Sequence, residues 1–294
     1  MTVKKDLFVC SCSFGKDSLA MLLRLLESGM PVDIILFNET GLDFPEMEEH
    51  ISKVEEYIKK YTDIGITRLK PEHPFEYYFY DVLIHHRKKT KFNERLGTDS
   101  HNGFSWPGPK MRWCTDRLKT RPRTKFLRDY RKEYNIIEYV GIAADEEYRL
   151  RRKINDRENK RYPLVDWGMT EADCLKYCYD RGFDWGGLYE KFSRVSCWCC
   201  PLQSLPGLRV LYHEFPEHWK QLKKWDNETY GQFRIDYSVE DFTDVVRLVF
   251  EDGSEETYVF EEYYYVSPLD QKHYLVTQGL DRLRNVLDYM MENR

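Results

Sequence analysis

No stretch of the 294-residue sequence contains the ~18 consecutive apolar residues that a membrane-spanning helix requires. The opening residues, MTVKKDLFVC, also lack the basic-then-apolar pattern of a secretory leader, and no internal repeat or low-complexity linker is visible. We therefore expect a cytoplasmic protein that does not bind a membrane. Its length allows one large domain or two modest ones.

Cysteine is absent after Cys200, and the eight cysteines of the chain are unevenly spread. A long chain without a secretory signal argues against a disulfide framework. Cys197, Cys199 and Cys200 lie within four residues, and thiolates this close either bind a soft metal or are prone to oxidation. The other pairs fall within a predicted strand or on one face of a predicted helix, which is typical of small core residues: Cys10 with Cys12, and Cys174 with Cys178.

Acidic residues are scarce from His85 to Lys132, where fifteen lysines and arginines accompany four acids. Basic residues are scarce from Asp226 to Glu262, where twelve acids accompany Arg234 and Arg247. A basic run is often only a solvated surface. Here aromatic residues, prolines and a cysteine interrupt the charge, in WPGPKMRWCTDRLKTRPR, which favours a site for an anion.

Hydrophobic periodicity predicts alternating strands and helices. Because the first elements read strand–helix–strand, we expect a parallel sheet with right-handed crossovers. Near the C-terminus, VVRLVFEDGSEETYVFEEYYYV alternates around Asp252-Gly253, which predicts a β-hairpin. The predicted strands are residues 7–12, 32–37, 66–70 and 136–142, and the predicted helices are residues 16–26, 44–61, 74–89, 115–133, 170–181, parts of 206–224, and 280–291.

The stretch VCSCSFGKDSLAMLLRLL places a glycine between a strand and an apolar helix. Gly15 lets the backbone turn tightly, so the first helical N–H groups and the positive end of the helix dipole face an anion. Lys16 adds a charge, and the Ser13 and Ser18 hydroxyls can donate hydrogen bonds. Asp17 caps the helix or holds Mg2+. Phosphate is the expected ligand and an ordinary capped turn is the alternative; the spacing is shorter than that of the Walker A loop.

SFGKDS resembles the PP-loop, the pyrophosphate-binding signature of the ATP pyrophosphatases and of the phosphoadenylyl-sulfate (PAPS) reductase family. Ala143 stands where that family commonly has an arginine. Five further blocks resemble the family's motifs in the family's order: FNETGLDFPEMEEHI, RWCTDRLKTRP, GIAADEEYRLR, YPLVDW and GLYEKFSRVSCWCCP.

The resemblance implies an α/β fold, a doubly wound parallel sheet of the adenine nucleotide alpha hydrolase (Rossmann-like) type in residues 1–205. A smaller α+β extension would occupy residues 206–294. Nucleotide, ATP or a related adenine nucleotide, is expected at the carboxyl ends of the strands, which is also where open parallel sheets bind ligands. Residues matching the PP-loop are expected to hold its phosphates: Ser13, Phe14, Gly15, Lys16, Asp17 and Ser18.

The end of the second strand is expected to frame the adenine or ribose, with polar strand caps as the alternative: Asn38, Glu39, Thr40 and Gly41. Catalytic roles are expected for Lys16, Asp17 and Arg151, the last in an arginine position of the family. Four further cations are candidates for binding a second anion: Lys110, Arg112, Lys119 and Arg149. The alternative for these four is a surface that is salt-bridged with nearby acids.

Relatives that carry a 4Fe-4S cluster use a Cys-Cys pair and a later Cys-x-x-Cys as ligands. This chain has Trp113 in place of one cysteine of the pair. Cys199 is the nearest candidate for the fourth ligand, with Cys174 or Cys178 behind it. Four thiolates suit zinc equally, and a reduced, metal-free site is the third possibility. The three matching ligand positions are Cys114, Cys197 and Cys200.

Three functions fit these observations. The first is an ATP-cleaving enzyme that releases pyrophosphate and adenylates a substrate, with a sulfur transfer as one possible purpose. The second is a sulfonucleotide reductase, which the absence of a cysteine after Cys200 disfavours. The third is a nucleotide- and metal-binding module of a larger assembly. The substrate, a small molecule or a nucleic acid, stays open, as does a homodimer or protein partner bound through the C-terminal region.

Overall fold

A computed structural model of the chain describes residues 4–85, 100–151, 159–234 and 239, together with four short strands between residues 245 and 275. The chain divides into two compact units, Met1–Leu211 and Tyr212–Arg294. Each unit has its own sheet or sheets, and each is described by itself below.

Unit 1 is built on a five-stranded parallel sheet with the order β3-β2-β1-β6-β7. From β1 the chain moves outward through β2 and β3, then returns to the other side of β1 with β6, so the winding reverses between β1 and β6. This order confirms the predicted doubly wound α/β fold. Ligands of such sheets bind where the winding reverses. The strands are β1 (Lys5–Ser11), β2 (Ile34–Asn38), β3 (Ile66–Leu69), β6 (Tyr134–Tyr139) and β7 (Lys160–Arg161).

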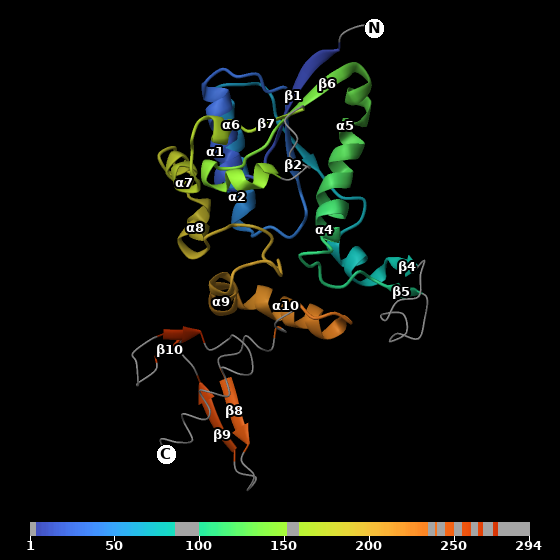
Figure 1. Cartoon of the computed structure of the whole chain (residues 1–294), viewed down its shortest axis with the longest axis vertical. Helices are drawn as coiled ribbons and strands as arrows, with labels where there is room; N and C mark the ends of the chain where they lie inside the picture. The colour runs from blue at the N-terminus through green and yellow to red at the C-terminus, as the bar shows by residue number, and fades with distance from the viewer. Residues whose placement is uncertain are drawn as a thin grey trace. The chain divides into compact units, whose positions relative to one another are not determined.

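Helices cover both faces of this sheet, as the apolar strands require. Figure 1 shows α5 (Arg121–Glu133) on one side of the strands and α1 (Lys16–Glu27) on the other. Leu127 is the buried residue of α5 and packs in a cluster with Val9, Leu36 and Ile136 of the strands. The second helix of the chain, α2, spans Glu46–Ile58.

The helix α7 (Glu171–Tyr179) packs along α1. Thr170 begins it with a capping box, in which its hydroxyl accepts from the Asp173 backbone N–H and the Asp173 carboxylate accepts from the Thr170 N–H. Cys174 and Cys178 are fully buried, as are Cys10 and Cys12. The prediction that these four cysteines are core residues is therefore confirmed.

The prediction of a helix over residues 74–89 is wrong from Leu83, where a strand begins. Tyr77–Asp81 forms a single π-helical turn, and β4 (Leu83–His85) then pairs antiparallel with β5 (Ser100–Asn102). The aromatic residues here pack with Trp113 and its neighbours, which overrides the helical pattern. Residues 86–99 lie outside the described residues. The predicted helix at 115–133 is interrupted by a π-helical turn at Asp116–Thr120, so Pro122 falls in the first turn of α5, where proline is tolerated.

Short helical turns complete unit 1, which ends within α9 (Leu205–Glu214). They are α4 (Trp113–Thr115), α6 (Pro163–Asp166), α8 (Leu188–Lys191) and the 3-10 turns Ala144–Arg151 and Trp185–Gly187.

Unit 2 contains α10 (Pro216–Glu228), with Trp219, Leu222 and Trp225 buried. The predicted hairpin is confirmed by the antiparallel pairing of β8 (Val245–Val249) with β9 (Glu255–Val259). A second pair joins β10 (Tyr264–Val266) and β11 (His273–Leu275). The helix predicted at residues 280–291 lies outside the described residues. In the part of the chain that is described, none of the helices has both the length and the apolar character needed to cross a bilayer.

Candidate functional site

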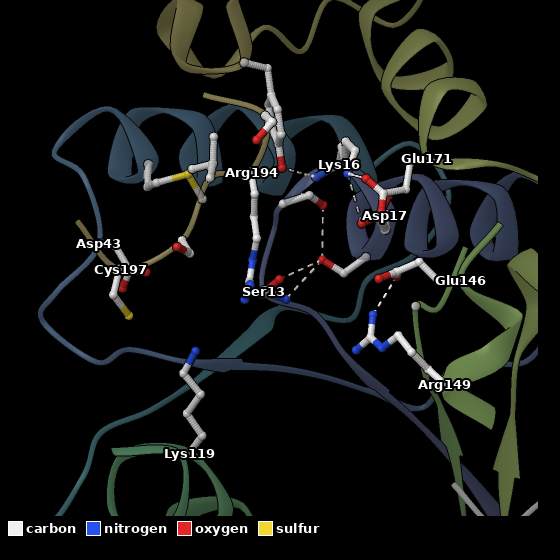
Figure 2. A pocket seen from close by; sticks show the side chains of 18 of the residues that line it. Ser13, Lys16, Asp17, Asp43, Lys119, Glu146, Arg149, Glu171, Arg194 and Cys197 are labelled. Carbon is white, nitrogen blue, oxygen red and sulfur yellow. Dashed lines mark hydrogen bonds and ion pairs between the residues drawn. The ribbon is translucent and has the colours of Figure 1, made fainter. Parts of the chain in front are cut away.

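A cavity of about 590 Å³ lies in unit 1, where β1 leads into α1 and β6 ends. Drug-sized and nucleotide-sized ligands bind in cavities of this order. Figure 2 shows acidic and basic side chains reaching into it from several elements. It is lined by Ser13, Gly15, Lys16, Asp17, Ser18, Asp43, Met47, Arg112, Lys119, Gly141, Glu146, Tyr148, Arg149, Glu171, Tyr189, Ser193, Arg194, Val195, Ser196 and Cys197.

The turn before α1 joins β1 to the helix where the sequence predicts it, but its left-handed residue is Phe14 and not Gly15, whose φ is −73°. Gly15 is the N-cap residue of α1. A Cβ atom at this position would lie 3.1 Å from the Tyr189 hydroxyl oxygen, so the lack of a side chain lets Tyr189 approach the turn. The Ser13 and Ser18 hydroxyl oxygens lie 3.1 Å apart, and Ser18 Oγ accepts from the Ser13 N–H at 3.2 Å. The hydrogen bonds between Ser13 and Ser18 therefore stabilise the turn at the N-terminus of α1.

Phe14 is buried in the core, whereas its neighbours Ser13 and Gly15 line the cavity. It adopts a left-handed backbone with φ 58°, its ring is buried against Phe37, and its carbonyl accepts a 2.7 Å hydrogen bond from Trp185 Nε1. Phe14 thus fixes the shape of the turn from the core side. Phe14 does not line the cavity.

The Lys16 ammonium lies 2.5 Å from Glu171 Oε2 and 3.4 Å from Asp17 Oδ2. Burial lowers its pKa, but the hydrogen bond to Glu171 and the charges of Asp17 and Glu171 outweigh burial, so the net pKa is raised. Lys16 is consequently a permanent cation at the start of α1. Its backbone N–H donates a 2.8 Å hydrogen bond to the Tyr189 hydroxyl.

Asp17 is a largely buried carboxylate with a raised pKa. Burial raises its pKa to about 6, with Glu171 and Glu146 adding repulsion and Lys16 opposing them. Its Oδ1 atom is buried and has no hydrogen-bond partner. Mg2+ is a hard cation that is commonly held by one or two carboxylates together with phosphate oxygens, so this orphaned oxygen fits the predicted Mg2+ role.

Gly141 follows β6 and allows the strand end to approach α1. A Cβ on Gly141 would lie 3.1 Å from Ser18 Cα and 3.2 Å from Ser18 N. Only a glycine permits this approach without displacing the start of the helix.

The cations of the cavity fall into two groups. The paired cations are Lys16, described above, and Arg149, whose Nη1 lies 2.5 Å from Glu146 Oε2. Figure 2 shows Arg194 and Lys119 reaching into the cavity from opposite walls. The unpaired cations, which form no ion pair within the described residues, are Arg112, Lys119 and Arg194.

The predicted residues at the end of β2 lie beside the cavity and do not line it. Asn38 Oδ1 is buried without a partner, and Glu39 forms ion pairs with Lys70 at 3.3 Å and with Arg68 at 4.0 Å. Thr40 Oγ1 donates to Asp43 Oδ2 at 3.2 Å, which links Asp43 of the cavity to β2. Gly41 has φ 76°. An adenine or ribose contact of these four residues stays a prediction.

Arg151 is not brought together with Lys16 and Asp17. It ends the 3-10 turn Ala144–Arg151 and lines a neighbouring hollow with Glu147, Tyr148 and Leu150, of which Tyr148 also lines the main cavity. A catalytic role of Arg151 stays a prediction. Arg149, two residues earlier, is the arginine of this turn that lines the main cavity. Lys110 is exposed outside it.

The four predicted metal ligands lie within electrostatic reach of one another. Burial raises the pKa of Cys199, and the thiols of Cys197, Cys200 and Cys114 raise it further. Burial also raises the pKa of Cys197 to about 11, while Lys119 opposes the shift. Trp113, in the position of the missing cysteine, is buried and donates from Nε1 to the Ser105 carbonyl at 2.9 Å.

Among the described residues, no three cysteine, histidine or acidic side chains are arranged to hold a metal ion. All eight cysteines are free thiols. The side chains as they lie therefore do not form a ligand set for a 4Fe-4S cluster or zinc, and metal binding by Cys114, Cys197, Cys199 and Cys200 stays a prediction.

The cavity side chains that were not predicted as site residues from the sequence include Glu171, Tyr189 and Arg194. Each comes from the second half of unit 1. Glu171 lies on α7, which packs along α1, and Tyr189 lies on α8, where its hydroxyl accepts from the Lys16 backbone N–H. A signal for Arg194 exists in the sequence, since it stands three residues before Cys197 in a block that resembles the PAPS reductase family.

The family model for the phosphoadenosine phosphosulfate reductase domain matches residues 8–203. Two uncharacterized proteins of Methanocaldococcus jannaschii, MJ0066 and MJ0973, are 27% and 29% identical over 76% and 73% of this chain. These matches span 42% and 47% of the two relatives, so the chain spans less than half their length. The adenosine 5'-phosphosulfate reductase of Geobacillus kaustophilus is 25% identical over 66% of this chain and 73% of its own.

Two solved structures are also similar. A phosphoadenylyl-sulfate (PAPS) reductase from Candida auris, in a phosphate complex, matches with 14% identity and a TM-score of 0.39, covering 65% of this chain and 81% of its own. The U34-tRNA thiolase NcsA from Methanococcus maripaludis, with its 4Fe-4S cluster, matches with 13% identity and a TM-score of 0.35, covering 79% of this chain and 77% of its own.

Proposed function

Because this chain belongs to the phosphoadenosine phosphosulfate reductase domain family, we propose that it is an enzyme that binds ATP and adenylates an anionic substrate. The bond between the α- and β-phosphates breaks, pyrophosphate leaves, and an oxygen of the substrate takes the AMP group. A nucleophile, for example a sulfur donor, then displaces AMP from the activated substrate.

One observation carries this proposal. The Ser13–Ser18 turn, which carries Lys16, lines a single cavity of about 590 Å³ together with four further cations. Lys16 and the N-terminus of α1 are suited to the phosphates, since backbone N–H groups and an ammonium bind phosphate oxygens. The unpaired cations Arg112, Lys119 and Arg194 offer charge for the leaving pyrophosphate and for an anionic group of the substrate.

Most of the rate would come from positioning and charge neutralisation, as in other phosphate chemistry. Asp17, with its unpartnered buried oxygen, would hold Mg2+ against the phosphates. When bound, Mg2+ neutralises charge on the phosphate oxygens as pyrophosphate leaves. Arg149 stays paired with Glu146 and contributes its charge at the edge of the cavity.

The test supplies the purified protein with ATP labelled at the α-phosphate and with candidate substrates, small anions in one set and nucleic acids in another. Formation of labelled AMP or an adenylated product, stimulated by one candidate, supports the proposal. Lys53 is the matched control for Lys16, because it is an exposed α2 lysine paired only with Glu49 at the surface. If Lys16→Ala and Lys53→Ala form AMP and bind ATP as the parent does, the turn is structural and the proposal fails.

A sulfonucleotide reductase is the second candidate, because Cys197 places a thiol in the cavity. In that reaction a thiolate attacks the sulfur of adenosine 5'-phosphosulfate and AMP leaves. The raised pKa of Cys197, about 11, leaves little thiolate at neutral pH and disfavours this role. With a dithiol supplied as reductant, which releases sulfite from the S-sulfocysteine formed on the enzyme, sulfite production from adenosine 5'-phosphosulfate that is lost in Cys197→Ser would favour the reductase over the adenylating enzyme.

The predicted metal site calls for its own measurement. Iron with acid-labile sulfide in anaerobically purified protein would support a cluster on the four thiols, and stoichiometric zinc would support a structural zinc site. Neither outcome alters the phosphate chemistry proposed above, in which no step passes through these cysteines.

A further inference from the structure

Glu171 occupies the position on Lys16 that a phosphate oxygen would take. Its Oε2 atom lies 2.5 Å from the Lys16 ammonium, a charge-assisted hydrogen bond. The Lys16 side chain is 9% exposed, whereas the Glu171 side chain is 40% exposed. Lys16 is therefore enclosed in the site, and Glu171 is the partner with a path to solvent.

The backbone of Glu171 is held in place. Its N–H donates to both carboxylate oxygens of Asp145, at 3.1 and 3.3 Å. The preceding Thr170 forms the capping box, and Cys178 of the same helix lies against the Lys16 carbonyl, with its Sγ at 3.6 Å. Because Asp145 holds the start of α7 and Cys178 holds its far end against α1, Glu171 leaves Lys16 by rotating its side chain.

The second donor of Lys16 is occupied in a similar way. The Lys16 backbone N–H donates to the Tyr189 hydroxyl at 2.8 Å. Tyr189 is itself fixed by its ring, which packs edge to face on Trp185 with centroids 4.6 Å apart. The ammonium of Lys16 thus has Glu171 as its nearest anion, with Asp17 Oδ2 further away at 3.4 Å, and its backbone N–H has the Tyr189 phenol.

We propose that Glu171 is a displaceable stand-in anion, a positioning residue that holds Lys16 until a nucleotide phosphate takes its place and thereby limits the affinity of the site. The proposal rests on the function proposed above only in taking the Ser13–Ser18 turn as the phosphate site. An incoming phosphate must break the ion pair, and the released carboxylate still repels it at short range.

Removing this carboxylate should therefore tighten binding, the opposite of what loss of an ordinary binding residue does. Glu171→Gln keeps the shape of the side chain and removes its charge. We expect affinity for ATP and for pyrophosphate to rise roughly two- to fivefold, the range of an ion pair that is partly exposed to solvent. Affinity for adenosine, which has no phosphate, should not change.

Asp180→Asn is the matched control. Asp180 ends the same helix and pairs at the surface with Lys176 at 2.6 Å, so the change removes one negative charge from α7 without touching the turn. Calorimetric titrations with ATP, pyrophosphate and adenosine, in EDTA and again with Mg2+, compare the parent, Glu171→Gln, Asp180→Asn and Lys16→Ala. A thermal melt of each variant verifies the fold, and Glu171→Ala repeats the test where Glu171→Gln is not folded.

Tighter phosphate binding in Glu171→Gln, with Asp180→Asn at the parental value, supports the inference. Unchanged or weaker ATP binding in EDTA overturns it. Weaker binding only with Mg2+ also overturns it, because Glu171 would then be a metal ligand and not a competitor. If Lys16→Ala binds ATP as the parent does, the proposed phosphate site itself fails, whereas a weakened Lys16→Ala with an unchanged Glu171→Gln rejects this inference alone.

Discussion

The two groups of cations in the cavity differ in what holds them. Lys16 and Arg149 each have a carboxylate at 2.5 Å, Glu171 and Glu146 respectively. Arg112, Lys119 and Arg194 line the same cavity with no ion pair to any described residue. A paired cation is part of the folded structure, and its loss leaves an uncompensated carboxylate. An unpaired cation contributes little to the fold and is available to a ligand, so the two groups should respond differently to mutation.

The largest effect is expected at a paired cation. Lys16→Ala should weaken ATP binding roughly 10- to 100-fold, because a hydrogen bond to a charged group contributes about 1.5–3 kcal/mol. It should also lower the unfolding free energy, since Glu171 and the largely buried Asp17 both lose their cation. Calorimetry and chemical denaturation measure the two effects. Parental values for both would show that the pairing has no role in binding or in stability.

The second prediction concerns the pH dependence of stability that Asp17, next to Lys16, gives to the fold. Its folded pKa, about 6, is above the ordinary 3.8, so the folded state binds a proton more tightly than the unfolded chain. The contribution of Asp17 to stability therefore falls as pH rises from about 4 to about 6 and is least favourable above 6. Asp17→Asn should raise the unfolding free energy by about 1–3 kcal/mol at pH 7.5, and the gain should vanish near pH 4. A gain that grows at low pH would contradict the assignment.

Gly141 tests how closely β6 must approach the turn. Gly141→Ala should cost about 1 kcal/mol or more, because its Cβ would lie 3.1 Å from Ser18 Cα and the start of α1 must shift. Gly65→Ala is the control, since a Cβ there meets nothing within 4 Å. Denaturation curves compare the two, and equal stabilities would mean that the helix start yields without cost.

The smallest effect on folding is expected at an unpaired cation. Arg194→Gln should leave the unfolding free energy within about 0.5 kcal/mol of the parent, as is usual for surface changes that break no pair. Pyrophosphate affinity should fall roughly two- to fivefold, the size of one solvent-screened charge. Arg149→Gln is the comparison, because it should lose stability as well by stranding Glu146. The distinction between the groups disappears if both variants behave alike.

The sequence by itself determined the scaffold and the turn. Alternating apolar strands and helices predicted a parallel sheet, and the resemblance to the PAPS reductase family implied that it is doubly wound. A glycine followed by Lys16, Asp17 and Ser18 at a helix start predicted an anion site, because this signal depends on local spacing. The sequence also placed Arg112, Lys119 and Arg149 as anion candidates, and these three line the cavity. It failed at residues 74–89, where aromatic packing overrides helical periodicity.

Only the tertiary structure decided which side chains meet the turn. Glu171 and Tyr189 are 155 and 173 residues from Lys16 along the chain, and they contact it only in the folded structure. It also separated Arg151 from the cavity that Arg149 lines. No local pattern encodes such meetings, because they depend on how whole elements are placed by the burial of their apolar faces. The turn itself consists of six consecutive residues, Ser13–Ser18, whereas Glu171, the carboxylate paired with Lys16, is brought to it by the packing of α7 along α1.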